Sequence, residues 1–388
     1  FRISKRLIFS VAEELAKVCG DAGRFIHWGG TSQNIVDTGY LLILKEFHGD
    51  LLDNLSSSID VLTELASKYS TTPLVGRTLG QNALPISFGF KIAGWIEELI
   101  RADNRFRDSE KRVFSLCCAG PVGAFHGFFG KGHKFSTLLA KRLKLNVLTV
   151  PNRVALDLKV EYIAGLCFLA MTINQISKEI LFMMSQNINE LSETQSPGQI
   201  GSSAMPHKIN PHYILEIISK AQLLRGKISI ALEAGISSNE ADLISNMTTN
   251  QIVQDSCNLA APLMSDFKTL FSNIIVNTEA MAKNLESSSQ FIASGNLMLK
   301  LATFLGTQDS HRIITECIKE SILVEQSIVK ILMQKSVVRK YVTEKEVISL
   351  LDPKKFTGES KKLVKKTLRN ANNAIKNIKN RREKFTNH

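Results

Sequence analysis

The sequence predicts an all-α protein, with a long central helical bundle followed by a smaller C-terminal helical domain. Apolar residues recur at helical spacing over stretches of roughly 25 residues or more, which is long for a globular helix and typical of a bundle. No strands alternate with these helices, and no Gly-x-Gly-x-x-Gly loop follows a strand. A doubly wound nucleotide-binding sheet is therefore disfavoured.

Five long helices are expected in the bundle. The first, Leu41–Ser70, carries apolar residues at helical spacing and ends before Pro73. The other four are Ile86–Leu116, Val160–Leu191, His212–Ala234 and Asn250–Ala282.

The pattern divides the chain into three parts. Residues 1–38 are predicted to be the remnant of an N-terminal domain, because the chain begins within a helical pattern. Residues 39–284 form the predicted bundle. Residues 285–388 carry shorter helices with turns at Gly306 and Pro353, and they form the predicted C-terminal domain.

Composition narrows the class of protein. Hydrophobic residues make up 44% and charged residues 22% of the chain, which is ordinary for a globular protein. No apolar run of about 18 residues and no signal peptide is apparent, so we expect neither a membrane helix nor secretion. The six cysteines form no Cys-x-x-Cys or Cys/His cluster, which favours buried free thiols, no metal and a cytoplasmic location.

Charge is concentrated at the C-terminus. The net charge is +12, and Lys361–Lys384 holds ten basic residues against one acid, Glu383. Nucleic-acid binding is one interpretation, but no aromatic residues are interleaved for base stacking. Apolar residues at helical spacing favour the solvated face of a terminal helix instead.

Three polar segments interrupt the helical pattern. His27–Thr38 contains Thr31 and Ser32, which can cap a helix start, and such a start also attracts carboxylates. Gly76–Gly89 contains Arg77 and Gln81 between two prolines; alone, such a stretch is most often a connector. The third segment, "GQIGSSAMPHKINPHYILE" (residues 198–216), is the most distinctive.

The third segment combines groups that suit chemistry beside a carboxylate. Lys208 supplies a positive charge and Asn210 a directional amide. Ser202 and Ser203 follow a glycine, and a serine becomes a base only where its alkoxide is stabilised by backbone N–H groups or a cation. A mobile loop of this kind could close over a substrate and exclude water. An ordinary linker has no need for this combination.

The string "GSSAMPHKINP" resembles the signature loop of the fumarase/aspartase superfamily. "HWGGTSQNIVDT" and "GRTLGQNALPISFGFKIAGW" resemble two further segments of that family, in the right order. The resemblance implies an all-helical homotetramer whose active sites are shared between subunits. It also implies reversible β-elimination or addition beside a carboxylate, on a small-molecule substrate, without a metal or other cofactor.

Site roles follow from the same resemblance. It implies that Ser202 is the general base and that His27 lies at an active-site position. Lys208 and Asn210 would hold one carboxylate, and Thr31 and Ser32 a second. Arg77, Gln81 and Ser203 are further expected substrate-binding residues.

Departures from the family pattern narrow the choice of branch within the superfamily. Leu79 and Leu215 stand where fumarate-releasing members usually carry a His/Glu pair, and the 3-carboxy-cis,cis-muconate cycloisomerase branch also lacks that pair. Leu156 and Leu158 replace two arginines of that branch, which disfavours a phosphate-bearing or tricarboxylate substrate unless Arg77, Arg153 or Lys159 compensates. A cycloisomerase-like lyase is the first hypothesis. An adenylosuccinate- or argininosuccinate-type C–N lyase and a catalytically weak scaffold are the alternatives.

Overall fold

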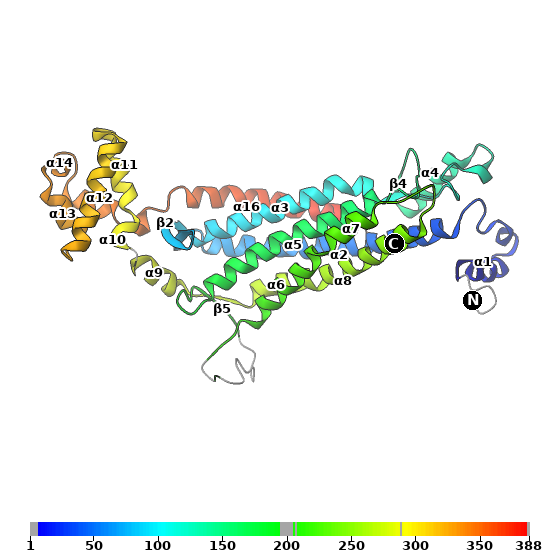
Figure 1. Ribbon diagram of the computed structural model, residues 1–388, viewed down its shortest axis with the longest axis horizontal. Coiled ribbons are helices and arrows are strands. Elements are labelled where there is room, and N and C mark those ends of the chain that lie inside the picture. The colour runs from blue at the N-terminus through cyan, green and yellow to red at the C-terminus, as the bar shows by residue number, and fades with distance from the viewer. Residues whose placement is uncertain (1–6, 195–204, 206–207, 288, 386–388) are drawn as a thin grey trace.

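The molecule is an elongated bundle of long helices with a smaller helical lobe at one end (Figure 1). The computed structural model describes residues 7–194, 205, 208–287 and 289–385. The bundle is formed by α2 (Ser32–Lys68), α3 (Phe88–Val113), α5 (Asp157–Met183), α6 (His212–Arg225), α7 (Lys227–Ala234), α8 (Leu243–Ser272) and α16 (Ser360–Arg382). The predicted all-α fold is confirmed.

The bundle core forms because each long helix has apolar residues three or four positions apart. On α2, Leu51, Leu55, Ile59 and Leu62 follow this spacing, and each is at most 2% exposed. Helix α2 packs against α3, α8 and α16, while α5 packs against α3 and α6. One continuous apolar core therefore runs through the bundle.

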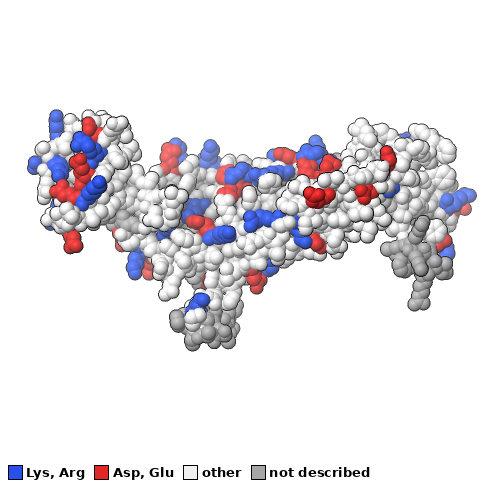
Figure 2. Space-filling view, viewed as in Figure 1, with Lys and Arg blue, Asp and Glu red and all other residues white. Residues whose placement is uncertain are grey.

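The C-terminal helix α16 returns from the lobe to lie along α2 and α3 (Figure 1). Val364, Ala371 and Ile378 lie in the bundle core, whereas the lysines of α16 are exposed. The basic tail is thus a solvated helix face on an amphipathic helix. On the face shown in Figure 2, basic side chains are interspersed with acidic ones along the bundle.

The lobe has its own core, which includes Leu297, Leu301, Ile331 and Leu332. Its helices are α10 (Ser289–Ile292), α11 (Ser294–Leu305), α12 (Thr307–Leu323), α13 (Ile328–Gln334), α14 (Ser336–Arg339) and α15 (Glu344–Leu350), followed by η3 (Pro353–Lys355). Helix α9 (Thr278–Ser287) joins this lobe to the bundle.

The opposite end of the bundle carries elements from two parts of the chain. These are α1 (Leu7–Val18), η1 (Gly20–Phe25), η2 (His126–Phe128) and α4 (Gly132–Leu143). The loop from residue 148 to residue 156 leads from this end into α5.

Short strands appear where the sequence predicted connectors or helix ends. β1 (Pro73–Thr78) and β2 (Gln81–Ser87) form an antiparallel hairpin within the segment interpreted as a connector. β3 (Ser115–Leu116) pairs with β4 (Asn146–Val147), and β5 (Leu191–Glu193) pairs with β6 (Ile274–Val276). β6 ends the predicted fifth helix early, because Ile274, Ile275 and Val276 are β-branched and favour extended backbone.

Helix α5 has an unusually apolar composition for its length, which was not singled out from the sequence. Among the described residues, α5 is long and apolar enough to cross a membrane by length and composition alone. However, 61% of its most apolar window is buried inside the protein. The apolar character of α5 is therefore accounted for by its place in the bundle core.

Candidate active site

The start of α2 is fixed by a capping box. Thr31 is the N-cap residue, and Asn34 at the third helical position accepts a hydrogen bond from the Thr31 backbone N–H at 3.1 Å. The buried Asn34 amide also donates to the Cys117 carbonyl at 3.2 Å and accepts from the Gly120 N–H at 3.2 Å. The first turn of α2, with exposed Ser32, is thereby held against the segment around Cys117.

His27 lies on a tight turn just before this helix. His27 has a φ of 66° and Gly29 a φ of 64°, both in the left-handed region. A Cβ at Gly29 would lie 2.7 Å from the Phe128 ring, so the close approach requires glycine. The Trp28 indole donates to the Gly127 carbonyl at 2.9 Å. The turn is thus anchored, and it presents a half-buried His27 near Thr31.

Asp37 is the centre of a hydrogen-bonded cluster one turn further along α2. Its carboxylate accepts from the Lys159 ammonium at 3.2 Å and from the amides of Asn246 and Asn250 at 3.1–3.2 Å. Gln33 donates to it at 3.1 Å. Because Lys159 also donates to Asn250 at 2.7 Å, the cluster ties α2 to both α5 and α8.

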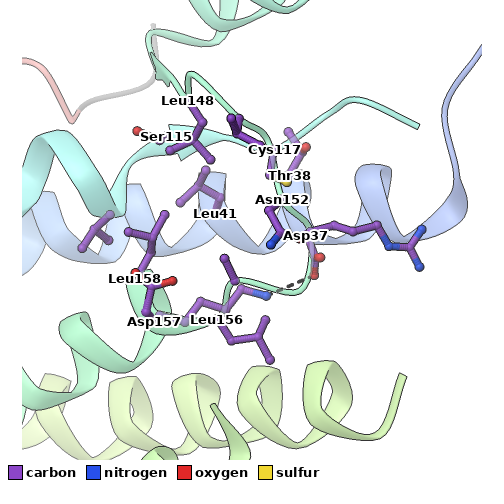
Figure 3. A pocket seen from close by; sticks show the side chains of 15 residues that line it. Asp37, Thr38, Leu41, Ser115, Cys117, Leu148, Asn152, Leu156, Asp157 and Leu158 are labelled. Atoms are coloured by element: carbon purple, nitrogen blue, oxygen red, sulfur yellow. Dashed lines mark hydrogen bonds and ion pairs between the residues drawn. The ribbon is translucent and has the colours of Figure 1, made fainter. Parts of the chain in front are cut away.

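A cavity of about 190 Å³ lies beside this cluster. Figure 3 shows its wall between α2 and the start of α5, with the Lys159–Asp37 contact dashed. Most of the lining surface is apolar, with side chains that include Leu41, Leu148, Leu156 and Leu158. Charged side chains also line it, from Asp37, Arg153, Asp157 and Lys159.

The Cys117 thiol in this wall stays protonated at neutral pH. Burial, reinforced by the nearby Asp37 carboxylate, raises the pKa of Cys117 to about 12. A protonated thiol is neither a nucleophile nor a metal ligand. Cys117 therefore contributes volume and a weak polar surface to the cavity.

The β1–β2 hairpin lies at the other end of α2 and holds the second predicted segment. Its Arg77 forms a bidentate pair with Glu190, with N–O distances of 2.7 and 3.0 Å. The two side chains are only 9% and 0% exposed, and Asn284 also donates to Glu190. The charge of Arg77, predicted to contact substrate, is thus neutralised within the chain.

The hairpin tip is fully exposed. Leu79 is 100% exposed with a φ of 53°, and Gly80 follows with a φ of 75°. A leucine rarely adopts the left-handed region, so this turn is locally strained. Gln81, the next predicted pocket residue, is also exposed and points to no partner within the described chain.

The third segment lies only partly within the described residues. Ser202 and Ser203 fall outside them. Lys208 is exposed just before α6 and has no acidic partner among the described residues, and Asn210 is half-buried. The first turn of α6 is capped by Glu193, which accepts from the N–H groups of Tyr213 and Ile214 at 3.2 and 2.7 Å.

The position of the expected glutamate on α6 is occupied by Leu215, which is 45% exposed. The adjacent Glu216 pairs with Lys220 at 3.1 Å, so its carboxylate is engaged along its own helix. One residue further along α6, Glu216 also points about 100° away from the direction of Leu215, so it does not occupy the position of the missing partner.

A single chain does not bring the three segments together. Thr31 and Ser32 lie at one end of α2 and the hairpin follows its other end (Figure 1). A helix of 37 residues is about 55 Å long. Both segments can reach one substrate only if different copies of the chain contribute them.

Comparison with known proteins places the chain in a family. Residues 3–226 match the family model described as Lyase, and residues 290–367 match that of the adenylosuccinate lyase C-terminus. N-acetyl-S-(2-succino)cysteine lyase from Enterococcus italicus is 30% identical over 92% of this chain and 78% of its own length. Adenylosuccinate lyase from Methanocaldococcus jannaschii is 29% identical over 95% of this chain and 81% of its own.

Solved structures agree with this placement. The crystal structure of 3-carboxy-cis,cis-muconate lactonizing enzyme from Pseudomonas putida has a TM-score of 0.85 and 26% identity, covering 95% of this chain and 82% of its own. The chain belongs to the Lyase family of the fumarase/aspartase superfamily, and it is a lyase-type enzyme by that membership. The resemblance inferred from the sequence is confirmed.

Sequence reasoning did not assign several residues that organise the site. Asp37 and Glu190 each hold a cation, but their partners are more than a hundred residues away in sequence. For Asn246 and Asn250 the sequence did contain a usable pattern, because two amides four positions apart lie on one helix face and can donate to the same acceptor. Among the described residues, no group of three His, Cys, Asp or Glu side chains could hold a metal ion.

Proposed function

We propose that the chain catalyses reversible β-elimination beside a carboxylate, releasing fumarate from a 2-succinyl conjugate that carries no phosphate. The observation that carries this proposal is the position of Lys208. It is an exposed ammonium without an acidic partner in the described part of the chain, directly after the Ser202–Ser203 motif and before α6. Such a cation suits an incoming carboxylate.

The proposed chemistry removes a proton from the carbon next to a carboxylate. Ser202, the proposed base, takes that proton, and the electron pair moves into the carboxylate to give an aci-carboxylate. Lys208 and Asn210 stabilise the added negative charge. The electron pair then returns to form the C=C bond, the C–S or C–N bond breaks with its electrons, and the leaving group takes up a proton. His27 is the proposed donor of that proton.

The substrate class is argued from the cavity lining. Leu156 and Leu158 supply no bidentate anion anchor, and Lys159 is paired with Asp37, so Arg153 is the lining's one cation without an ion pair to a described residue. A phosphate needs several strong donors. This disfavours a nucleotide and supports a compact conjugate with an uncharged part. N-acetyl-S-(2-succino)cysteine lyase, 30% identical, is a relative whose name describes such a conjugate.

A cycloisomerase-like reaction is the second candidate. The apolar Leu79 and Leu215, both exposed, occupy the positions of the His/Glu pair of fumarate-releasing relatives. The structural likeness to the muconate lactonizing enzyme favours it too. Both candidates share the elimination beside a carboxylate and differ in whether the product is a free diacid or a lactone.

We also propose that copies of the chain assemble so that one site draws on several of them, as a homotetramer. Large apolar side chains are exposed along one stretch of the bundle, including Leu223, Ile230, Ile244 and Met247, each more than half exposed. A monomer rarely leaves so many apolar side chains on neighbouring helices in water. We propose that the same face of another copy of the chain packs against these side chains.

The test is a substrate panel with a base variant. N-acetyl-S-(2-succino)cysteine, adenylosuccinate and 3-carboxy-cis,cis-muconate are offered, and the ultraviolet absorbance of fumarate or loss of the muconate chromophore is followed. We expect turnover of the thioether, and a loss of about two orders of magnitude or more in Ser202→Ala with an unchanged circular dichroism spectrum. Turnover that Ser202→Ala leaves intact would remove the proposed base. A protein inactive on the whole panel would favour the weak scaffold.

A further inference from the structure

Three basic side chains were candidates to compensate for the missing arginines, and the structure separates them. Arg77 is paired with Glu190, and Lys159 is paired with Asp37. Arg153 forms no ion pair with any described residue. It is therefore the one member of this trio whose charge is not matched within the described chain.

The backbone around Arg153 is fixed from three directions. Its carbonyl accepts from the Gln33 amide on the first turn of α2, at 3.5 Å. The next carbonyl, of Val154, accepts from the Ser237 hydroxyl, and the Val154 N–H donates to the Asn152 side chain at 3.2 Å. A loop held in this way presents the Arg153 side chain at a defined place.

The Arg153 side chain is partly buried and incompletely satisfied. Its Nε, like that of Arg77 and of Arg225, is buried and has no hydrogen-bond acceptor among the described residues. A buried donor without an acceptor costs about 1–3 kcal/mol, more for a charged group, so native structures rarely tolerate one without cause. An acceptor from outside the described chain would remove this cost.

The carboxylates near Arg153 do not supply that acceptor. Asp37 already accepts from Lys159, Asn246, Asn250 and Gln33. Asp157, on the first turn of α5, is exposed and forms no ion pair with Arg153.

We propose that Arg153 is a specificity-determining residue that binds a carboxylate of the substrate at the edge of the leucine-lined cavity. The inference rests on the proposed function for the identity of the anion, a dicarboxylate. The cavity of about 190 Å³ takes the uncharged part of the same molecule. For scale, an engineered cavity of about 150 Å³ accommodates benzene.

The kinetic test compares a 2-succinyl thioether with its two half-amides, each lacking one carboxylate charge. Wild type should disfavour both half-amides. Arg153→Leu should lower kcat/KM for the diacid by about 10- to 100-fold, mainly through KM, and abolish discrimination against one half-amide but not the other. Arg153→Lys should restore part of the loss. Arg142→Leu, an exposed arginine on α4, is the matched control and should leave these ratios unchanged.

A binding test keeps the inference separable from the proposed function. Fumarate is titrated against wild type and Arg153→Leu, and thermal unfolding is recorded. Fumarate should raise the Tm of wild type and not that of the variant. If no substrate is turned over but this difference holds, the proposed function fails and the anion site stands. The role of Arg153 would be overturned if fumarate raised the Tm of both proteins equally or did not raise the Tm of wild type. It would also be overturned if Arg153→Leu still discriminated against both half-amides.

Discussion

Replacing Arg77 by leucine should destabilise the protein rather than selectively weaken substrate binding. The substitution leaves the Glu190 carboxylate, which is 0% exposed, without its bidentate partner. Two charge-assisted hydrogen bonds are lost, and breaking a buried ion pair from one side costs about 3–5 kcal/mol. Asn284 still donates to Glu190, which places the expected loss toward the lower end of that range.

The assay is urea unfolding followed by circular dichroism, at one fixed chain concentration. With a slope of about 3 kcal/mol per molar, the midpoint should fall by about 1 M. The double variant Arg77→Leu with Glu190→Leu should recover most of the loss, because it removes the stranded charge. A stable Arg77→Leu protein whose defect lies in KM alone would refute this reasoning and return Arg77 to the substrate-binding residues.

Two further predictions concern the contact between the C-terminal helix and the bundle. Arg381→Ala should lower the free energy of unfolding, measured by urea titration, by about 3–5 kcal/mol, because it leaves the carboxylates of Asp103 and Glu110 without their cation. The control is Lys379→Ala, an exposed position on the same helix, which should cost under about 0.5 kcal/mol. Burial lowers the pKa of the His48 imidazole, so the folded state resists its protonation. Below about pH 6.5 the unfolded state therefore binds one proton more than the folded state, and the free energy of unfolding should fall as pH drops. Unfolding midpoints measured between pH 7.5 and pH 5 should show a smaller decline in His48→Gln; equal declines would contradict the assignment.

The fold was predictable to the extent that it depends on apolar periodicity. The helices now seen as α2, α3, α5 and α8 were all anticipated, because their apolar faces repeat over many turns. Their ends were less accurate: Gly226 divides the predicted fourth helix into α6 and α7, and the β1–β2 hairpin arose in a stretch interpreted as a connector. These outcomes depend on tertiary packing that local propensity does not encode.

From the sequence, the candidate site could be proposed as a set of segments but not as a set of contacts. Motif resemblance grouped Thr31, Arg77 and Lys208, although Thr31 precedes and Arg77 follows α2, a helix of 37 residues that is about 55 Å long. The sequence could not show that Arg77 is neutralised by Glu190 while Arg153 is left unmatched, since those relations join residues distant in sequence. Charge pairing therefore had to come from the structure.

The measurement that tests the account most directly is activity in mixed assemblies of two inactive variants. Ser202→Ala and Ser32→Ala chains are prepared separately, shown to lack activity, and then unfolded, mixed and refolded together. If one site draws residues from different copies, the mixture should regain activity that neither variant has alone. The presence of hybrid assemblies is verified by native mass spectrometry. If these hybrids are as inactive as the two variants alone, the proposal that one site draws residues from different copies is contradicted.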